Sequence, residues 1–200
     1  WAVWVVPIGI VGIVYQMTTN TNLVLIGQLA AFSGVVIGTT LLHMVVILPS
    51  IAWLGGRIQP ATLAKKTLRP IVVALSSSSS AATLPVSFHA ANDLGVSSTT
   101  ASFVLPLGST INMDGTALFE GVAAIFLAYL FGLDLNASAT VTVFLVAMLA
   151  SIGAPGIPSG SMAGMQMVLL AVGIPLEGIL ILLLVERPLD TIRTSANVLG

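Results

Sequence analysis

The sequence contains no cysteine and very few charged residues. It has six basic and seven acidic residues in 200, so charged residues make up 6% of the chain and the formal net charge is −1. Without cysteine, the sequence cannot form disulfides, a thiol nucleophile or a cysteine-ligated metal site. Soluble domains carry about 25% charged residues. The composition therefore excludes an ordinary soluble domain, and the net charge gives no indication of a nucleic-acid partner.

Apolar residues dominate instead, at 56% of the chain with a mean hydropathy of +1.09. This predicts an all-α, multi-pass integral membrane protein. The chain begins at Trp1 without an initiator methionine or a signal-peptide pattern, so we expect it to be part of a longer protein. Residues 1–58 are predicted to hold two transmembrane helices, over 1–15 and 23–54. His43 lies in the second, where we interpret it as hydrogen-bonded packing rather than a ligand.

Four of the six basic residues lie in the connection that follows, which by the positive-inside rule faces the cytoplasm. They are Arg57, Lys65, Lys66 and Arg69.

Two later segments consist of short apolar stretches joined by a tip of small residues. The first, about 60–94, has a serine-rich tip over 76–85, and the second, about 137–173, has a glycine- and proline-rich tip over 151–161. Each half is too short to span a bilayer, which predicts re-entrant helical hairpins that line a cavity. Serine packing between helices is the alternative interpretation of the first tip.

The span of about 99–131 is interrupted at its centre, between Pro106 and Thr116, by residues that are poor in helix interiors. A helix broken at the membrane midplane frees backbone carbonyls. Together with Asn112 and the Asp114 carboxylate, these supply hard oxygen ligands for a small cation. A simple kink, with Asp114 satisfied by neighbouring amides, is the alternative.

The last helix, about 176–200, has a polar face in its second half. Asp190, Arg193, Thr194 and Asn197 follow one another at spacings of three or four residues, which places them on one side of a helix. Such charges must face protein or a water-filled cavity. They form either a structural ion pair or a site for a zwitterion, in which Asp190 binds an ammonium and Arg193 binds a carboxylate.

The two halves repeat with opposite topology, each having a hairpin followed by a polar or broken helix, as in inverted-repeat transporters. Four stretches resemble the dicarboxylate/amino acid:cation symporters, the family that includes glutamate and neutral amino acid transporters. These stretches are Ser78–Pro85, Asn112–Thr116, Gly153–Pro158, and Asp190 with Arg193, Thr194 and Asn197.

The resemblance implies an elevator-type transport core over residues 59–200, in a protein that assembles as a homotrimer in the cell membrane. It implies that Asp190 binds the substrate amino group and Arg193 the side-chain carboxylate. The implied substrate site comprises Ser80, Thr116, Ile157, Gly160, Ser161, Asp190, Arg193, Thr194 and Asn197. The implied sodium sites comprise Gly108, Thr110, Asn112, Met113, Asp114, Ser151, Ile152, Ala154 and Asn197.

Having both Asp190 and Arg193 favours an acidic amino acid, aspartate or glutamate, as the substrate. An unpaired guanidinium would disfavour neutral substrates, and a dicarboxylate without an amino group would need no acid. Sodium is the expected coupling ion and no cofactor is expected, although proton coupling and a C4-dicarboxylate substrate remain alternatives. The sequence departs from the family at Ser78 and Thr191, where many members carry a second arginine, and at Glu186, which is usually aspartate. Pro188 is also unexpected inside the helix.

Two other classes of protein fit less well. An intramembrane serine protease would need a GxSG box followed by a histidine. The stretch Gly156–Gly160 has the wrong spacing, and both histidines, His43 and His89, precede it. We therefore expect no enzyme. A passive anion channel could use re-entrant tips, but channels usually repeat one filter by symmetry, whereas these tips differ.

Overall fold

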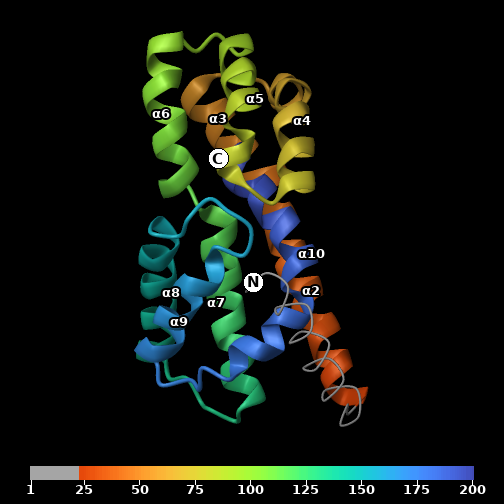
Figure 1. Cartoon of the computed structure of the whole chain (residues 1–200), viewed down its shortest axis with the longest axis vertical. Helices are drawn as coiled ribbons and strands as arrows, with labels where there is room; N and C mark the ends of the chain where they lie inside the picture. The colour runs from red at the N-terminus through yellow and green to blue at the C-terminus, as the bar shows by residue number, and fades with distance from the viewer. Residues whose placement is uncertain (1–22) are drawn as a thin grey trace, which may run out of the picture.

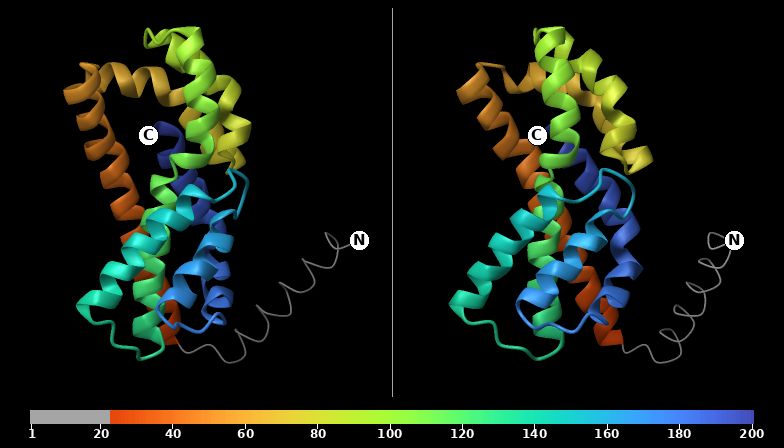
Figure 2. Two further views of the ribbon diagram at one scale, coloured as in Figure 1. Left: turned by 90° about the vertical axis from the view of Figure 1, so that its left-hand side faces the viewer. Right: turned by 60° about the vertical axis from the view of Figure 1, so that its left-hand side comes forward.

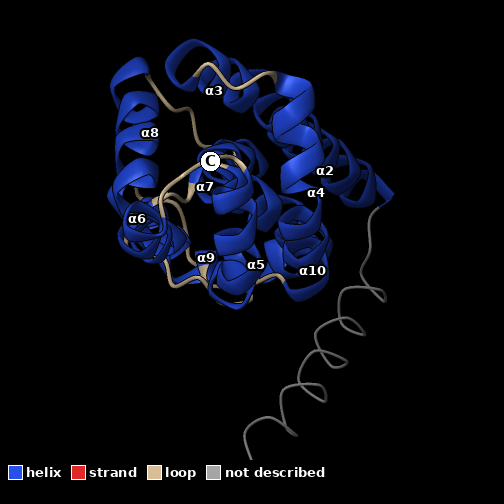
Figure 3. Cartoon of the chain, turned by 90° about the horizontal axis from the view of Figure 1, so that it is seen from above, coloured by secondary structure: helices blue, strands red, loops and turns tan. Residues whose placement is uncertain are grey.

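The computed structural model describes residues 23–200, so the helix predicted over 1–15 lies outside the described residues. Within 23–200 the regular secondary structure is entirely helical, which confirms the all-α prediction (Figure 3). The elements are α2 (Leu23–Leu42), a π-helix η1 (His43–Ile47), α3 (Leu48–Gly56), α4 (Pro60–Ser77), α5 (Ser80–Asp93), α6 (Ser98–Ile111), α7 (Asp114–Leu130), α8 (Ala137–Ile152), α9 (Ser161–Ala171) and α10 (Gly178–Leu199).

The serine-rich segment forms a tight turn between α4 and α5. Ser78 adopts the left-handed conformation, with φ of 51°, and so ends α4. Ser79 then caps α5, because its hydroxyl accepts a hydrogen bond from the Ala82 backbone N–H at 3.2 Å. A serine hydroxyl at this position satisfies one of the free N–H groups of a helix start. The two helices pack against each other as a pair.

The helix break predicted near residue 112 is present. α6 ends at Ile111 and α7 begins at Asp114, with Asn112 and Met113 in non-helical conformations between them. Pro106 lies within α6 and does not end it. The interruption thus falls at the Asn112–Met113 pair, as Figure 2 shows at the centre of the molecule.

α8 and α9 form the second helical pair, joined by a loop over residues 153–160. α10 follows and continues through Pro188 without interruption. Proline removes one backbone donor and crowds one carbonyl of the preceding turn. The missing donor and the crowded carbonyl lie on a partly exposed stretch of α10, since Leu184 and Arg187 are exposed.

Helix α7 lies at the centre of the hydrophobic core. It contacts α2, α8, α9 and α10, and Figure 3 shows them around it. Phe119 and Leu127 are completely buried, and Phe32 and Val36 bring α2 into the same cluster. Two helical stretches, Val24–Gly56 and Ser98–Leu130, are long and apolar enough to cross a membrane.

The two helical pairs occupy opposite halves of the molecule, with their tips directed toward the middle (Figure 1). The α4–α5 pair lies in the upper half and the α8–α9 pair in the lower half. α10 runs past both pairs and contacts each of them. The arrangement therefore brings the two tips, the α6–α7 break and the polar half of α10 to one region.

Candidate functional site

The two helical tips are joined at Gly156. Its carbonyl accepts hydrogen bonds from the Ser79 hydroxyl at 2.7 Å and from the Ala81 backbone N–H at 3.2 Å. A Cβ at residue 156 would lie 2.8 Å from the Ser109 carbonyl oxygen. Glycine is therefore required for the close approach of the second tip to both the first tip and the end of α6.

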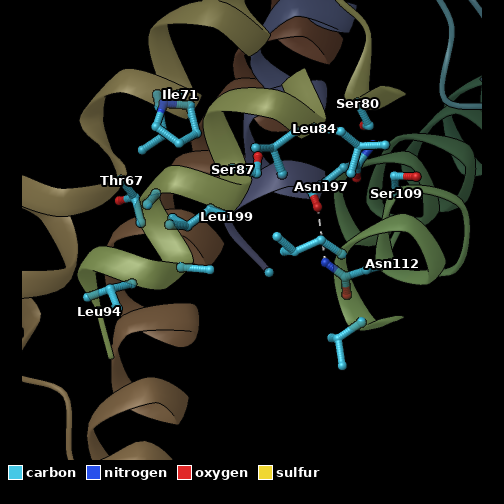
Figure 4. Close-up of a pocket in the computed structure, with 18 of the residues that line it drawn as sticks. Thr67, Ile71, Ser80, Leu84, Ser87, Leu94, Ser109, Asn112, Asn197 and Leu199 are labelled. Carbon is cyan, nitrogen blue, oxygen red and sulfur yellow. Dashed lines mark hydrogen bonds between the residues drawn. The ribbon is translucent and has the colours of Figure 1, made fainter. Parts of the chain in front are cut away.

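Asn197 connects the break to α10. Its side-chain oxygen accepts from the backbone N–H groups of Gly115 at 2.8 Å and Thr116 at 3.3 Å. Its amide group donates to the Thr116 hydroxyl at 3.1 Å. Asn112 donates in turn to the Asn197 backbone carbonyl at 3.1 Å (Figure 4). The Asn197 side chain on α10 thus accepts hydrogen bonds from N–H groups in the first turn of α7, which have no partner within their own helix.

Arg193 lies at the centre of the site. Its Nη2 donates to Asp190 Oδ1 at 2.8 Å and to Glu186 Oε1 at 2.9 Å, and all three side chains are buried. The guanidinium carbon lies 3.9 Å from the centroid of the Phe119 ring, a cation–π contact. The ion pair between Asp190 and Arg193, which one sequence interpretation predicted, is therefore formed.

The second tip closes over this cluster through Ser159. Its backbone N–H donates to Asp190 Oδ2 and its hydroxyl to Glu186 Oε2, both at 2.9 Å. Ser159 makes these two contacts in the left-handed conformation, with φ of 59°. Arg187, which is exposed, lies 3.8 Å from Asp190. Asp190 and Glu186 thus each accept hydrogen bonds from both Arg193 and Ser159.

Two donors of the buried guanidinium are not used by the described residues. Arg193 Nε and Nη1 are buried and have no hydrogen-bond partner among residues 23–200. Buried donors are rarely left unsatisfied in native proteins, and each exception calls for a ligand, a water or a functional reason. Nε–H and Nη1–H lie on different edges of the planar guanidinium, each beside the occupied Nη2, so they offer two separate donors to a carboxylate.

A small cavity collects the predicted substrate residues, apart from Arg193. It holds only about 10 Å³ of space, roughly enough for one water molecule. All of these residues are buried except Ile157, which is exposed. Those lining the cavity are Ser80, Thr116, Ile157, Gly160, Ser161, Asp190, Thr194 and Asn197.

The predicted cation ligands fall into two groups. Gly108, Asn112 and Asn197 line a second cavity, of about 190 Å³, that lies between the α4–α5 pair, α6 and the end of α10 (Figure 4). Asn112 Oδ1 and Asp114 Oδ1 have no hydrogen-bond partner among the described residues, so both oxygens are available to a cation.

The other group lies near the α6 end and the second tip. Thr110 and Ile152 are exposed, whereas Met113, Ser151 and Ala154 are buried. The Thr110 hydroxyl donates to the Leu107 carbonyl of its own helix.

The structure adds three residues that were not among the predicted site residues. Glu186 and Ser159 contact the Arg193 cluster directly. Glu120, on α7, is completely buried, and neither of its carboxyl oxygens has a partner among the described residues. A Cβ at residue 164 would collide with Glu120, so α9 approaches α7 closely at this point. A single acid in an apolar span was the signal that could have identified Glu120.

Paired short helices and a broken helix that meet at one place are features of membrane transporters, and comparisons with known proteins agree. A family model described as the sodium:dicarboxylate symporter family matches residues 1–200. Rat (Rattus norvegicus) excitatory amino acid transporter 1 is 41% identical over 202 residues, covering 98% of this chain and 37% of that protein. Mouse (Mus musculus) excitatory amino acid transporter 2 is 45% identical over 174 residues, covering 86% and 30% respectively.

The chain belongs to the sodium:dicarboxylate symporter family, and its resemblance to that family, predicted from the sequence, is confirmed. The chain spans about a third of the length of these relatives, 37% of the first and 30% of the second.

Proposed function

We propose that this chain forms the substrate- and cation-binding part of a symporter that couples the uptake of aspartate or glutamate to sodium. The observation that carries the proposal is the buried Arg193 guanidinium, with two free donors, between two carboxylates. Family membership and the names of the relatives support the same class of substrate.

The proposed substrate complex uses both charges of the cluster. The side-chain carboxylate of the substrate accepts a hydrogen bond from an unpaired N–H of Arg193, at Nη1 or Nε, and its ammonium group binds Asp190. A cavity of about 10 Å³ is too small for an amino acid. The second tip must therefore move away from α10 before substrate enters, which breaks both contacts of Ser159.

The proposed cation sites use neutral oxygens and one carboxylate. Asn112 Oδ1, Asp114 Oδ1 and carbonyls at the break suit a hard cation such as sodium. Because Asn197 contacts the break through its side chain and belongs to the proposed substrate site, it links cation binding to substrate binding.

The wider mechanism is proposed from the family. We propose that the two helical pairs are re-entrant hairpins of inverted topology, that the core of residues 59–200 moves as an elevator, and that the complete protein is a homotrimer in the cell membrane. The opposed placement of the two helical pairs in Figure 1 supports the hairpin assignment.

Transport by the complete protein in proteoliposomes tests this function. An inward sodium gradient should drive uptake of labelled aspartate, and unlabelled aspartate inside should accelerate exchange in a counterflow assay. Uptake without counterflow would indicate a channel, and no aspartate uptake under a sodium gradient would contradict the proposal.

Protons are a second candidate for the coupling ion. The observation that favours them is Glu120, a buried and unpartnered carboxyl group in a membrane helix. Ionisable groups at such positions are typical of proton pathways. If protons are coupled, a pH gradient should drive aspartate uptake without sodium, and Glu120→Gln should abolish that dependence.

A further inference from the structure

The helix before the first helical pair contains a local irregularity at His43. Between α2 and α3 the backbone forms a five-residue π-helix, His43–Ile47, closed by a hydrogen bond from the Leu48 N–H to the His43 carbonyl. Pro49 follows at the start of α3. Proline removes a backbone donor and crowds the carbonyl four residues earlier, and widening the preceding turn relieves that contact. Such π-turns occur frequently at functional sites.

The π-turn places His43 against the α6–α7 break. His43 Nε2 lies 3.0 Å from Asp114 Oδ2, across 71 residues of sequence. The two side chains are 20% and 34% exposed. An ionised carboxylate can only accept hydrogen bonds, so the histidine nitrogen is the donor in this contact.

The contact constrains one oxygen of Asp114 and leaves the other available. Asp114 is the first residue of α7, and Oδ1 has no partner among the described residues. The end of α10 borders the same place, since a Cβ at residue 200 would lie 3.0 Å from Asp114 Oδ2 and 2.5 Å from Asn112 Nδ2. His43 is thus the side chain that holds Asp114 Oδ2.

We propose that His43 is a positioning residue for the cation site: by donating to Asp114 Oδ2 it orients the carboxylate so that Oδ1 can bind sodium. This inference rests on the proposed function. Carboxylates that bind metals are commonly held by such outer hydrogen bonds, and removing one typically reduces metal affinity by about 10- to 100-fold.

The test measures the sodium concentration that gives half-maximal aspartate binding, using the complete protein in sodium chloride balanced with choline chloride. His43→Leu removes the donor and should raise this concentration about tenfold. Aspartate affinity at saturating sodium should stay unchanged. His43→Gln retains an N–H at a similar distance and should stay within about twofold of the wild type. His43→Met, which also lacks the donor, should repeat the result of His43→Leu.

Two controls separate this role from general packing. His89→Leu changes the other histidine, which is exposed on α5, and should leave the sodium dependence unaltered. Asp114→Asn combined with His43→Leu should be no worse than Asp114→Asn alone, because His43 acts through Asp114.

The results that overturn the role are distinct from those that overturn the function. An unaltered sodium requirement in His43→Leu and His43→Met, an equal loss of aspartate affinity at saturating sodium, or additive effects in the double variant would each refute the role of His43. A wild type whose aspartate binding ignores sodium would refute the proposed function, and the role of His43 with it.

Discussion

Arg193 is a completely buried cation whose charge is balanced within two turns of its own helix. Glu186 and Asp190 both contact its Nη2, and Ser159 satisfies the remaining acid oxygens. Removing one member of a buried ion pair leaves an uncompensated charge, which is strongly destabilising. Loss of either acid would therefore leave Arg193 uncompensated, and an acidic substrate must reach the unpaired N–H groups at Nη1 and Nε.

Replacing Arg193 tests that contact. Arg193→Cys should weaken aspartate binding by at least about 30-fold, since truncating a buried charged partner costs about 2–5 kcal/mol. The smaller, uncharged site should then accept neutral amino acids. Calorimetric titration with aspartate and serine measures both effects. Arg187→Cys is the matched control: its side chain is 61% exposed, and such surface pairs contribute about 0–1 kcal/mol. Equal losses in the two variants would contradict the role of Arg193.

Replacing Asp190 tests whether this residue binds the amino group of the substrate. Asp190→Asn keeps an oxygen that can accept from the Ser159 N–H but loses the negative charge. Aspartate affinity should fall about tenfold or more, and the affinity for succinate, which has no amino group, should fall less. Competition binding with both ligands measures the difference, and a parallel loss would argue against ammonium binding at Asp190.

At the scale of elements, the second tip closes over the site mainly through Ser159 and Gly156. Each uses a few hydrogen bonds between a loop and a helix, rather than a large apolar contact. Segments held in this way are the ones that open locally. Opening of residues 153–160 is therefore the motion that the structure makes easiest near the site.

Because residues 1–200 contain no cysteine, a thiol introduced in the second tip has no competing thiol in this part of the protein, so labelling can measure that motion. In Ser161→Cys, the new thiol replaces a hydroxyl that is buried in the cavity and lacks a partner among the described residues. Its labelling by a polar thiol reagent should be slow, should slow further with aspartate, and should accelerate when Ser159→Ala is added. Ile157→Cys, at a side chain that is 57% exposed, should label quickly in every state. A labelling rate of the Ser161→Cys variant that ignores both aspartate and Ser159→Ala would refute a moving tip.

The contact between α7 and α10 depends on Gly115. A Cβ there would lie 2.5 Å from the Arg193 carbonyl oxygen, which is backbone and cannot move aside. Gly115→Ala should destabilise the fold by about 1–3 kcal/mol and weaken substrate binding. Gly34→Ala is the control, since nothing lies within 4 Å of its added Cβ. Thermal unfolding of both variants measures this, and equal melting temperatures would contradict the packing argument.

The residue types and their spacing within each segment explain which elements could be predicted from the sequence. The break near Asn112 and the two tips follow from glycine, proline and serine in otherwise apolar stretches, and the shared face of Asp190, Arg193 and Asn197 follows from helical spacing. Pro188 is an exception to this rule, because proline usually interrupts a helix but α10 continues through it.

The contacts that complete the site could not be read in the same way. Ser159 lies 27 and 31 residues from its two acids, and His43 lies 71 residues from Asp114. No periodicity links residues so far apart. Only the packing of the tips and of the π-turn against the break brings them together.

At the scale of the whole molecule, the central claim is that sodium and an acidic amino acid bind together at the meeting point of the two tips, the break and α10. The most direct measurement is calorimetric binding of aspartate to the complete protein, in sodium chloride and in choline chloride at equal ionic strength. Aspartate should bind tightly in sodium and not at all in choline. Equal affinity in both salts, or no aspartate binding in either, would contradict joint binding of sodium and an acidic amino acid at this place.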